Sequence, residues 1–173
     1  SNNFTSCKGA GLYAENSTLR ISNCEVDGNF GYNEDGEYMH GCGFQFLKCT
    51  VNMENMYFHD NICTVAFDSC TVNVNKAVFA NNFSTNAGGM GIQRSNDYEV
   101  RVSNLLFYNN VVRHYGGAMA IATSSPLIQN TTMAFNYTIG AGGGAMQFFS
   151  EARPIFKNCI IWGNDWYDYD AVF

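Results

Sequence analysis

Acidic and histidine side chains beside apolar segments are the residues of this chain that could do acid/base chemistry. His59 and Asp60 are adjacent, and Asp27 and Asp68 lie close to other apolar runs. Enzymes that cleave polysaccharides need carboxylates held together, often with a basic residue. These acids do not share one position in the pattern described below, and a polar surface bend explains His59 and Asp60 more simply. We therefore expect no catalytic residues.

Metal binding is a second chemistry to consider. The segment 31–40 contains Glu34, Asp35 and Glu37, whose oxygens could hold Ca²⁺. Their spacing differs from that of an EF-hand, so we expect a solvated acidic loop. The cysteines show no zinc-binding spacing, and there is no nucleophile elbow, phosphate loop or dinucleotide fingerprint. The sequence therefore predicts neither a metal site nor a cofactor.

Sugar binding is a third chemistry to consider. Both tryptophans lie in the segment 162–170, among acidic residues. Exposed aromatic rings beside carboxylates can stack on sugar rings, so Trp166, Tyr167 and Tyr169 are candidate surface-binding residues. The alternative, which we favour, is that these rings cap the fold or pack against a following unit.

Glycosylation is possible at five Asn-x-Ser/Thr sequons, which begin at Asn3, Asn16, Asn82, Asn130 and Asn136. Asn16 lies in a polar loop and is the candidate glycan site in a eukaryotic secretory host. Asn82, Asn130 and Asn136 belong to a repeated pattern, which predicts that they are inaccessible.

The elements that position these residues follow from an eleven-residue block that occurs six times. Its template is Φ-x-Φ-x-N-x-x-Φ-x-x-N, where Φ is apolar, and the final Asn is present in all six blocks. The steps between final Asn residues are 32, 21, 28, 26 and 28 residues, which is typical of a solenoid. The blocks are LRISNCEVDGN (19–29), VNMENMYFHDN (51–61), VNVNKAVFANN (72–82), VRVSNLLFYNN (100–110), PLIQNTTMAFN (126–136) and PIFKNCIIWGN (154–164).

Apolar residues alternate within each block, which is the period of a half-buried strand. The alternation restarts after the inner Asn, so a block predicts a strand, a bend at Asn, a second strand and a second bend at Asn. Asn tolerates the left-handed backbone region that such bends need, and stacked Asn side chains can hydrogen-bond between coils. The predicted ladder residues are Asn23, Asn55, Asn104, Asn130 and Asn158 at the inner position, and Asn29, Asn61, Asn82, Asn110, Asn136 and Asn164 at the final position.

A third strand precedes most blocks and follows a glycine corner. Examples are GGMGI (88–92), GGAMAI (116–121) and GGAMQF (143–148), whereas the third coil has TVAF (64–67) instead. Glycine permits a tight corner there. Three short strands and three bends per turn describe a parallel β-helix. We therefore predict an all-β fold: a single-stranded right-handed parallel β-helix of about six rungs.

The seven cysteines allow two interpretations. Cys49 and Cys70 both lie two residues before a block, on successive coils. Neighbouring parallel strands are about 4.8 Å apart, which is within the Cα range that a disulfide accepts. A disulfide and a pair of stacked, buried free thiols both fit this spacing.

Composition limits the class of protein. With 173 residues, of which 46% are hydrophobic, the chain can form one ordered domain. A net charge of −6 and nine scattered Lys and Arg residues argue against nucleic-acid binding. No run of eighteen apolar residues exists, so we expect no membrane insertion. Because the chain starts in mid-repeat, we expect residues 1–173 to be one β-helix segment of a longer protein.

Two signatures resemble the repeats of chlamydial polymorphic membrane proteins. They are GGA-Φ, at 116–119 and 143–146, and F-x-x-N, at 58–61, 79–82 and 107–110. The segment 154–164 is also similar to β-helix repeats of large exported bacterial surface proteins. This resemblance spans nearly the whole chain and implies a secreted β-helical passenger that mediates adhesion, with cysteines that can cross-link.

The expected function is therefore that of a non-enzymatic structural or adhesive segment of a secreted or cell-surface protein, such as a stalk, an adhesin or a filament subunit. Its partner would be a protein or glycan surface ligand, or another copy bound end to end. The alternative is a carbohydrate-active β-helix, either a polysaccharide lyase or hydrolase or a sugar-binding module. An enzyme would show stacked carboxylates and a basic residue on one face.

Overall fold

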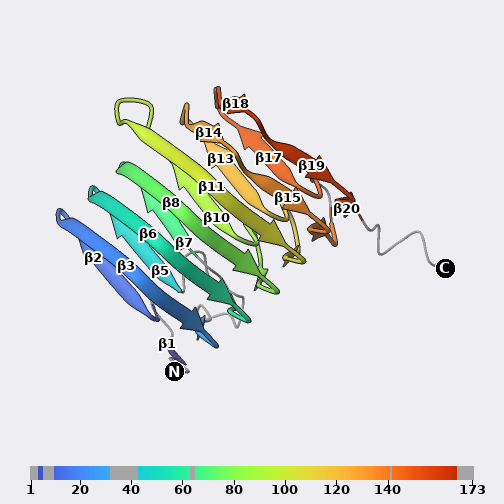
Figure 1. Ribbon diagram of the computed structural model, residues 1–173, viewed down its shortest axis with the longest axis horizontal. Helices are drawn as coiled ribbons and strands as arrows, with labels where there is room; N and C mark the ends of the chain where they lie inside the picture. Colours follow the sequence, from blue (N-terminus) through green and yellow to red (C-terminus); the bar gives the residue numbers. More distant parts are fainter. Residues whose placement is uncertain (1–3, 6–9, 32–42, 63–64, 141, 167–173) are drawn as a thin grey trace.

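The computed structural model describes residues 4–5, 10–31, 43–62, 65–140 and 142–166. Every regular element in these ranges is a strand, and the paired strands run parallel. Strands from successive repeats lie side by side, so the chain climbs as a coil (Figure 1). The described ranges contain no helix long and apolar enough to cross a bilayer. The predicted all-β solenoid is confirmed.

In the described residues, three parallel sheets and one separate parallel pair of strands run along the coil, and the first two sheets contain strands from six successive coils, or about five turns. The first sheet contains β2 (Leu12–Glu15), β5 (Phe44–Leu47), β7 (Val65–Asp68), β10 (Met90–Gln93), β13 (Met119–Ala122) and β17 (Met146–Phe149). The second contains β3 (Thr18–Asp27), β6 (Thr50–His59), β8 (Thr71–Ala80), β11 (Val100–Tyr108), β14 (Leu127–Gln129), β15 (Thr132–Ala134), β18 (Ile155–Lys157) and β19 (Ile160–Trp162).

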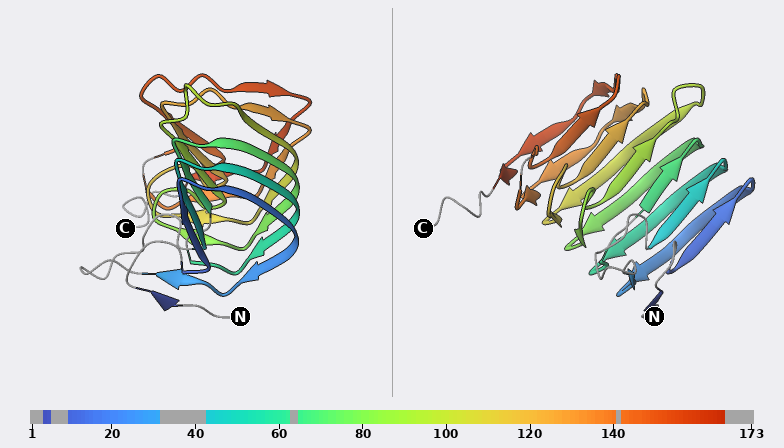
Figure 2. Two further views of the ribbon diagram at one scale, coloured as in Figure 1. Left: turned by 90° about the vertical axis from the view of Figure 1, so that its left-hand side faces the viewer. Right: turned by 180° about the vertical axis from the view of Figure 1, so that it is seen from behind.

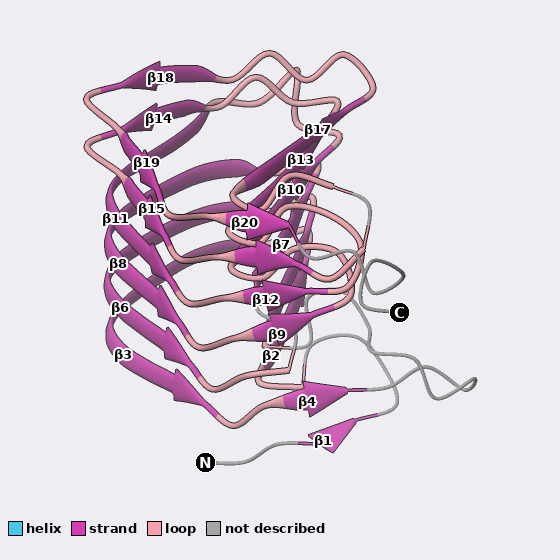
Figure 3. Cartoon of the chain, turned by 90° about the vertical axis from the view of Figure 1, so that its right-hand side faces the viewer, coloured by secondary structure: helices cyan, strands magenta, loops and turns pink. Residues whose placement is uncertain are grey.

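The third sheet consists of two-residue strands that directly follow the final Asn of a block and that the sequence pattern did not predict. They are β9 (Phe83–Ser84), β12 (Val111–Val112), β16 (Tyr137–Thr138) and β20 (Asp165–Trp166), and β1 (Phe4–Thr5) pairs with β4 (Phe30–Gly31) in the same way. Figure 3 shows these short strands stacked beside the longer ones. Strands of two residues are too short to show alternation in the sequence.

The repeated block forms one bent strand in the first four coils, where two strands were predicted. Pairing continues on both sides of the inner position, which has φ values of 56° at Asn23, 55° at Asn55, 54° at Lys76 and 57° at Asn104. In the last two coils the ladder breaks at this position, and the block becomes β14 and β15, then β18 and β19. The left-handed residue therefore bends the strand, as expected for Asn.

The core is a set of columns in which equivalent residues stack. The rings of Phe58, Phe79 and Phe107 stack with centroids 4.8 Å apart at each step and are nearly parallel, with interplanar angles of 2° and 8°. This separation matches the strand spacing of about 4.8 Å. At the glycine corners the backbones approach closely, since a Cβ on Gly88 would collide with the carbonyl oxygen of Gly117 in the next coil. The left view of Figure 2 shows the coils stacked one above another.

Candidate functional site

The final Asn of each block lies in one column, as predicted, and this column is buried except at its last member, Asn164, which is half-buried. Nδ2 of Asn82 donates to Oδ1 of Asn110 at 2.8 Å, and the backbone N–H of Asn82 donates to the same oxygen at 3.1 Å. Nδ2 of Asn82 also donates to the carbonyl of Phe58 at 3.1 Å. Each interior amide therefore uses both N–H groups and both acceptor positions inside the protein. The side-chain links join Asn29, Asn61, Asn82, Asn110, Asn136 and Asn164 at 2.8–3.0 Å.

The bend at this column does not use Asn for its backbone conformation, which corrects the sequence interpretation. The residue with positive φ is the one before each final Asn, for example Asp60 at 53° and Phe135 at 55°. The buried Asn is needed for its hydrogen bonds, because an unpaired amide is costly in a dry interior.

The inner Asn residues form a second column, which is exposed. Asn55 donates to Asn23 at 2.8 Å, and Asn130 donates to Asn104 at 3.2 Å. Asn158 donates to Asn130 at 3.3 Å. The expectation that Asn130 is inaccessible is wrong, because its side chain points outward at the bend. Within the described residues, each of these amides uses no more than one N–H in the protein.

Lys76 replaces Asn in the middle of the exposed column. Its Nζ lies 3.4 Å from Oε1 of Glu54, and Asn104 donates instead to Asn75 at 2.7 Å. The column is therefore interrupted at one coil by a cation with the same bent backbone.

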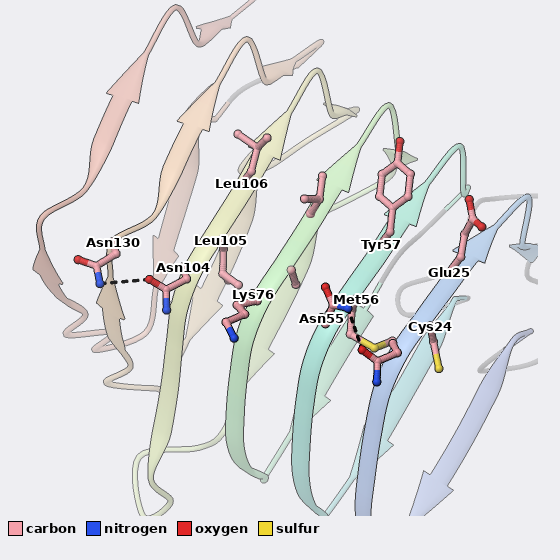
Figure 4. Close-up of a pocket in the computed structure, with 13 residues that line it drawn as sticks. Cys24, Glu25, Asn55, Met56, Tyr57, Lys76, Asn104, Leu105, Leu106 and Asn130 are labelled. Carbon is pink, nitrogen blue, oxygen red and sulfur yellow. Dashed lines mark hydrogen bonds between the residues drawn. The ribbon is translucent and has the colours of Figure 1, made fainter.

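A shallow groove of about 720 Å³ follows the exposed column across five coils (Figure 4). Met56, Ala77 and Leu105 form its floor, since each is at most 3% exposed and lines the hollow. Tyr57 and Leu106 project beside it. A smaller hollow of about 320 Å³ lies next to it on the same strands. Its lining residues are Arg20, Ile21, Ser22, Asn52, Met53, Glu54, Asn73 and Asn75.

His59 and Asp60, the candidate acid/base pair, form part of an ion-pair cluster. Nδ1 of His59 lies 2.7 Å from Oδ2 of Asp60, and Nε2 lies 2.8 Å from Oε1 of Glu25 on the preceding coil. The hydrogen bond with Asp60 raises the pKa of His59, against the opposing effect of burial, and Glu25 raises it further. Both ring nitrogens are engaged, so neither is open to take a proton from a substrate. Asp27 faces His59 in the strand register.

Asp68 is also held in an ion pair. It is 5% exposed and accepts a hydrogen bond from Nε of Arg94 at 2.8 Å, a second from the same guanidinium, and one from Nε2 of Gln93 at 3.1 Å. This bidentate contact raises the pKa of Arg94. These contacts of Asp68 with Gln93 and Arg94 join two successive coils. Among the described residues, no group of three or more His, Cys, Asp or Glu side chains could hold a metal ion.

Cys49 and Cys70 are free thiols and not a disulfide. The backbone N–H of Cys49 points to Sγ of Cys70 at 3.3 Å, and that of Cys70 donates to Oγ of Ser95 at 3.1 Å. The column continues from Ser95 to Ser124 at 3.0 Å. Sequence reasoning found the two cysteines but missed the serines, although Ser124 also lies two residues before its block.

Trp166 and Asn16, two of the remaining candidates, do not line the groove. Trp166 is 50% exposed and its indole N–H contacts the carbonyl of Gly140. Tyr167, Tyr169 and the acidic segment 32–40 lie outside the described residues. Asn16 is exposed at a bend with φ of 50° between β2 and β3.

The chain was compared with protein-family models, curated proteins and solved structures. No family model, curated protein or solved structure matches the chain. The resemblance to chlamydial polymorphic membrane proteins therefore depends on the GGA-Φ and F-x-x-N motifs alone. The parallel solenoid with its Asn ladder is consistent with repeats of that kind.

Proposed function

We propose that this chain is a non-enzymatic, structural and adhesive β-solenoid segment of a secreted or cell-surface protein. The observation that carries the proposal is the fully hydrogen-bonded Asn column, which ties six coils into one stiff body. A stiff rod suits a stalk or an adhesin, because it holds its surface at a fixed distance from its anchor. Similarity to the repeats of exported bacterial passengers supports the same assignment.

The ionisable side chains support a binding role over a catalytic one. His59 is engaged by two carboxylates, and Asp68 is engaged by Arg94. These contacts stabilise neighbouring coils and leave neither group poised as a general acid or base. The alternative, a carbohydrate-active module, is favoured in its sugar-binding form by the groove along the exposed Asn column.

The test is to incubate the purified chain with arrays of glycans, matrix proteins and intact cells, and to assay the polysaccharides for new reducing ends or unsaturated products. Binding without turnover is the expected result. Turnover of any polysaccharide that disappears on His59→Gln or Glu25→Gln would overturn the assignment. A Trp166→Ala variant tests the tail as the binding element, and full retention of binding would exclude it.

A further inference from the structure

We propose that the groove beside Asn55 and Asn104 binds one extended, uncharged polysaccharide chain, which lies across the strands along the exposed Asn column. This inference rests on the adhesive function proposed above and gives it a site and a ligand class. It differs from the tail hypothesis, because Trp166 does not line this groove.

Hydrogen-bonding capacity distinguishes the two Asn columns. In the buried column, Nδ2 of Asn110 donates both to Oδ1 of Asn136 at 2.8 Å and to the carbonyl of Phe79 at 2.9 Å. In the exposed column, Nδ2 of Asn55 makes one bond, to Asn23, and Nδ2 of Asn130 makes one, to Asn104. An amide carries two donors. Among the described residues, the exposed amides therefore retain donors that the protein does not use, in a row that is interrupted at Lys76 and is suited to sugar hydroxyls.

Tyr57 supplies an apolar platform at one side of the groove. The residue is 41% exposed, and its ring stacks on His59 at a centroid distance of 4.2 Å, which holds it in place. His59 is itself fixed by Asp60 and Glu25. Figure 4 shows Tyr57 standing beside the Asn column. A pre-oriented aromatic ring of this kind can pack against the C–H face of a pyranose without losing further side-chain entropy.

The charged side chains that line the groove favour a neutral ligand. The groove and the adjoining hollow are lined by Glu25, Glu54, Lys76 and Arg20, whose charges cancel. Glu25 is bonded to His59, and Lys76 lies beside Glu54. An anionic polysaccharide would meet no excess of cations there, on a chain with net charge −6.

Lys76 occupies the one position of the exposed column, within the described residues, that is not Asn. Lys76 has φ of 54° at a bend where the other five coils have Asn. Lys76 lies at the middle of the groove, where its ammonium can donate to ring or hydroxyl oxygens.

The shape of the groove suits a polymer. It is open and spans five coils, which corresponds to about 19 Å at the strand spacing. Small-molecule sites are usually deep and enclose most of the ligand. An open hollow of this length fits several consecutive sugars of one chain.

The experiment is calorimetric titration of the full chain with length series of neutral oligosaccharides (cello-, xylo-, manno- and chito-oligosaccharides), with oligogalacturonate and heparin fragments as anionic probes. At least one neutral series should bind, with affinity that rises with length and stops rising once the sugar outgrows the groove. Asn104→Ala and Tyr57→Ala should each weaken binding about tenfold.

Matched variants outside the groove serve as controls. Asn109 directly follows β11, the strand that contains Asn104. It has φ of 54°, and its Nδ2 donates a 2.7 Å hydrogen bond to Asn81. Tyr13 is 42% exposed on the first sheet. Asn109→Ala and Tyr13→Ala should change the affinity by less than about twofold. Should Asn104→Ala fail to fold, Asn104→Asp keeps the bend and removes the donor, and it should weaken binding in the same way.

The outcomes separate this site from the proposed function. Equal affinity of the wild type, Asn104→Ala and Tyr57→Ala for a neutral sugar would overturn the site, as would a preference for the anionic probes. Attachment to cells or matrix without affinity for any neutral series would overturn the site and leave adhesion standing. Absence of all binding would overturn both.

Discussion

At the scale of single residues, His59 illustrates how one side chain links two coils. Its ring bridges Asp60 on its own coil and Glu25 on the preceding one, at 2.7 and 2.8 Å. Its pKa is raised above the ordinary value, chiefly by the bond to Asp60. The protonated form is therefore favoured in the folded state, and His59 makes folding depend on pH.

Because the folded pKa is raised, the contribution of His59 to stability is complete below the unfolded value of about 6.5 and is lost as pH rises through the folded pKa. We expect the unfolding free energy, measured by urea denaturation, to fall as the pH rises above about 6.5, by less than about 1 kcal/mol in total, since both carboxylates are exposed. The decrease in unfolding free energy with rising pH should be smaller in His59→Gln. An identical pH dependence in both proteins would contradict this account.

Thiol reactivity should follow burial. Cys49 and Cys70 are buried, and burial raises the pKa of Cys70, whereas Cys24 is exposed. Since the thiolate is the reactive form, iodoacetamide should label Cys24 in the native protein and reach Cys49 and Cys70 only after unfolding. Peptide mass mapping measures this order. Labelling of Cys70 as fast as that of Cys24 would contradict the buried column.

At the scale of elements, the two bends of each block use Asn for different reasons. Asn104 sits in the left-handed region itself, at 57°, whereas Asn110 follows a left-handed residue, Asn109, at 54°. The first Asn is suited to its position because it tolerates the left-handed backbone conformation, and its side chain is exposed. The second Asn is needed for the hydrogen bonds of its side-chain amide, which is buried.

Replacement by alanine should reveal this difference in stability. Asn110→Ala removes the acceptor of two bonds from Asn82 and leaves buried groups unpaired, so it should cost about 3–5 kcal/mol. Asn104→Ala should cost about 1–2 kcal/mol, from the strained backbone and two exposed bonds, one donated to Asn75 and one accepted from Asn130. Urea denaturation measures both values. Equal losses would show that the two columns are equivalent.

Lys76→Asn should restore the interrupted column. Asn tolerates φ of 54° better than Lys and can bond to Asn55 and Asn104. The exposed contact with Glu54 that is lost is weak. We expect a gain of about 1 kcal/mol in unfolding free energy, measured by urea denaturation. A loss of stability would mean that Lys76 makes a larger contribution to the fold than its contacts indicate.

At the scale of the whole molecule, the solenoid could be predicted from sequence because its columns are made of like residues. Phe58, Phe79 and Phe107 recur at one block position and stack. The groove could not be predicted, because its outward positions differ in type from coil to coil. Glu25, Tyr57 and Leu106 come to line one groove only through the register of β3, β6, β8 and β11.

Accessibility of the two Asn columns was likewise not predictable from the pattern. Both positions are Asn flanked by alternating apolar residues, and the sequence does not show which amide faces the core. The register places Asn136 at 0% exposure and leaves Asn130 exposed. Burial therefore separates a column that holds the rod together from one that is available to a ligand.

The most direct test of this separation is the exchange rate of asparagine side-chain amide protons, measured by NMR on selectively ¹⁵N-labelled protein. The account predicts that both Nδ2 protons of Asn61, Asn82 and Asn110 exchange far more slowly than in an unfolded peptide. At least one Nδ2 proton of Asn55 and of Asn130 should exchange at a rate close to that of free asparagine. Fast exchange at Asn82 and Asn110, or equal protection of both columns, would contradict it.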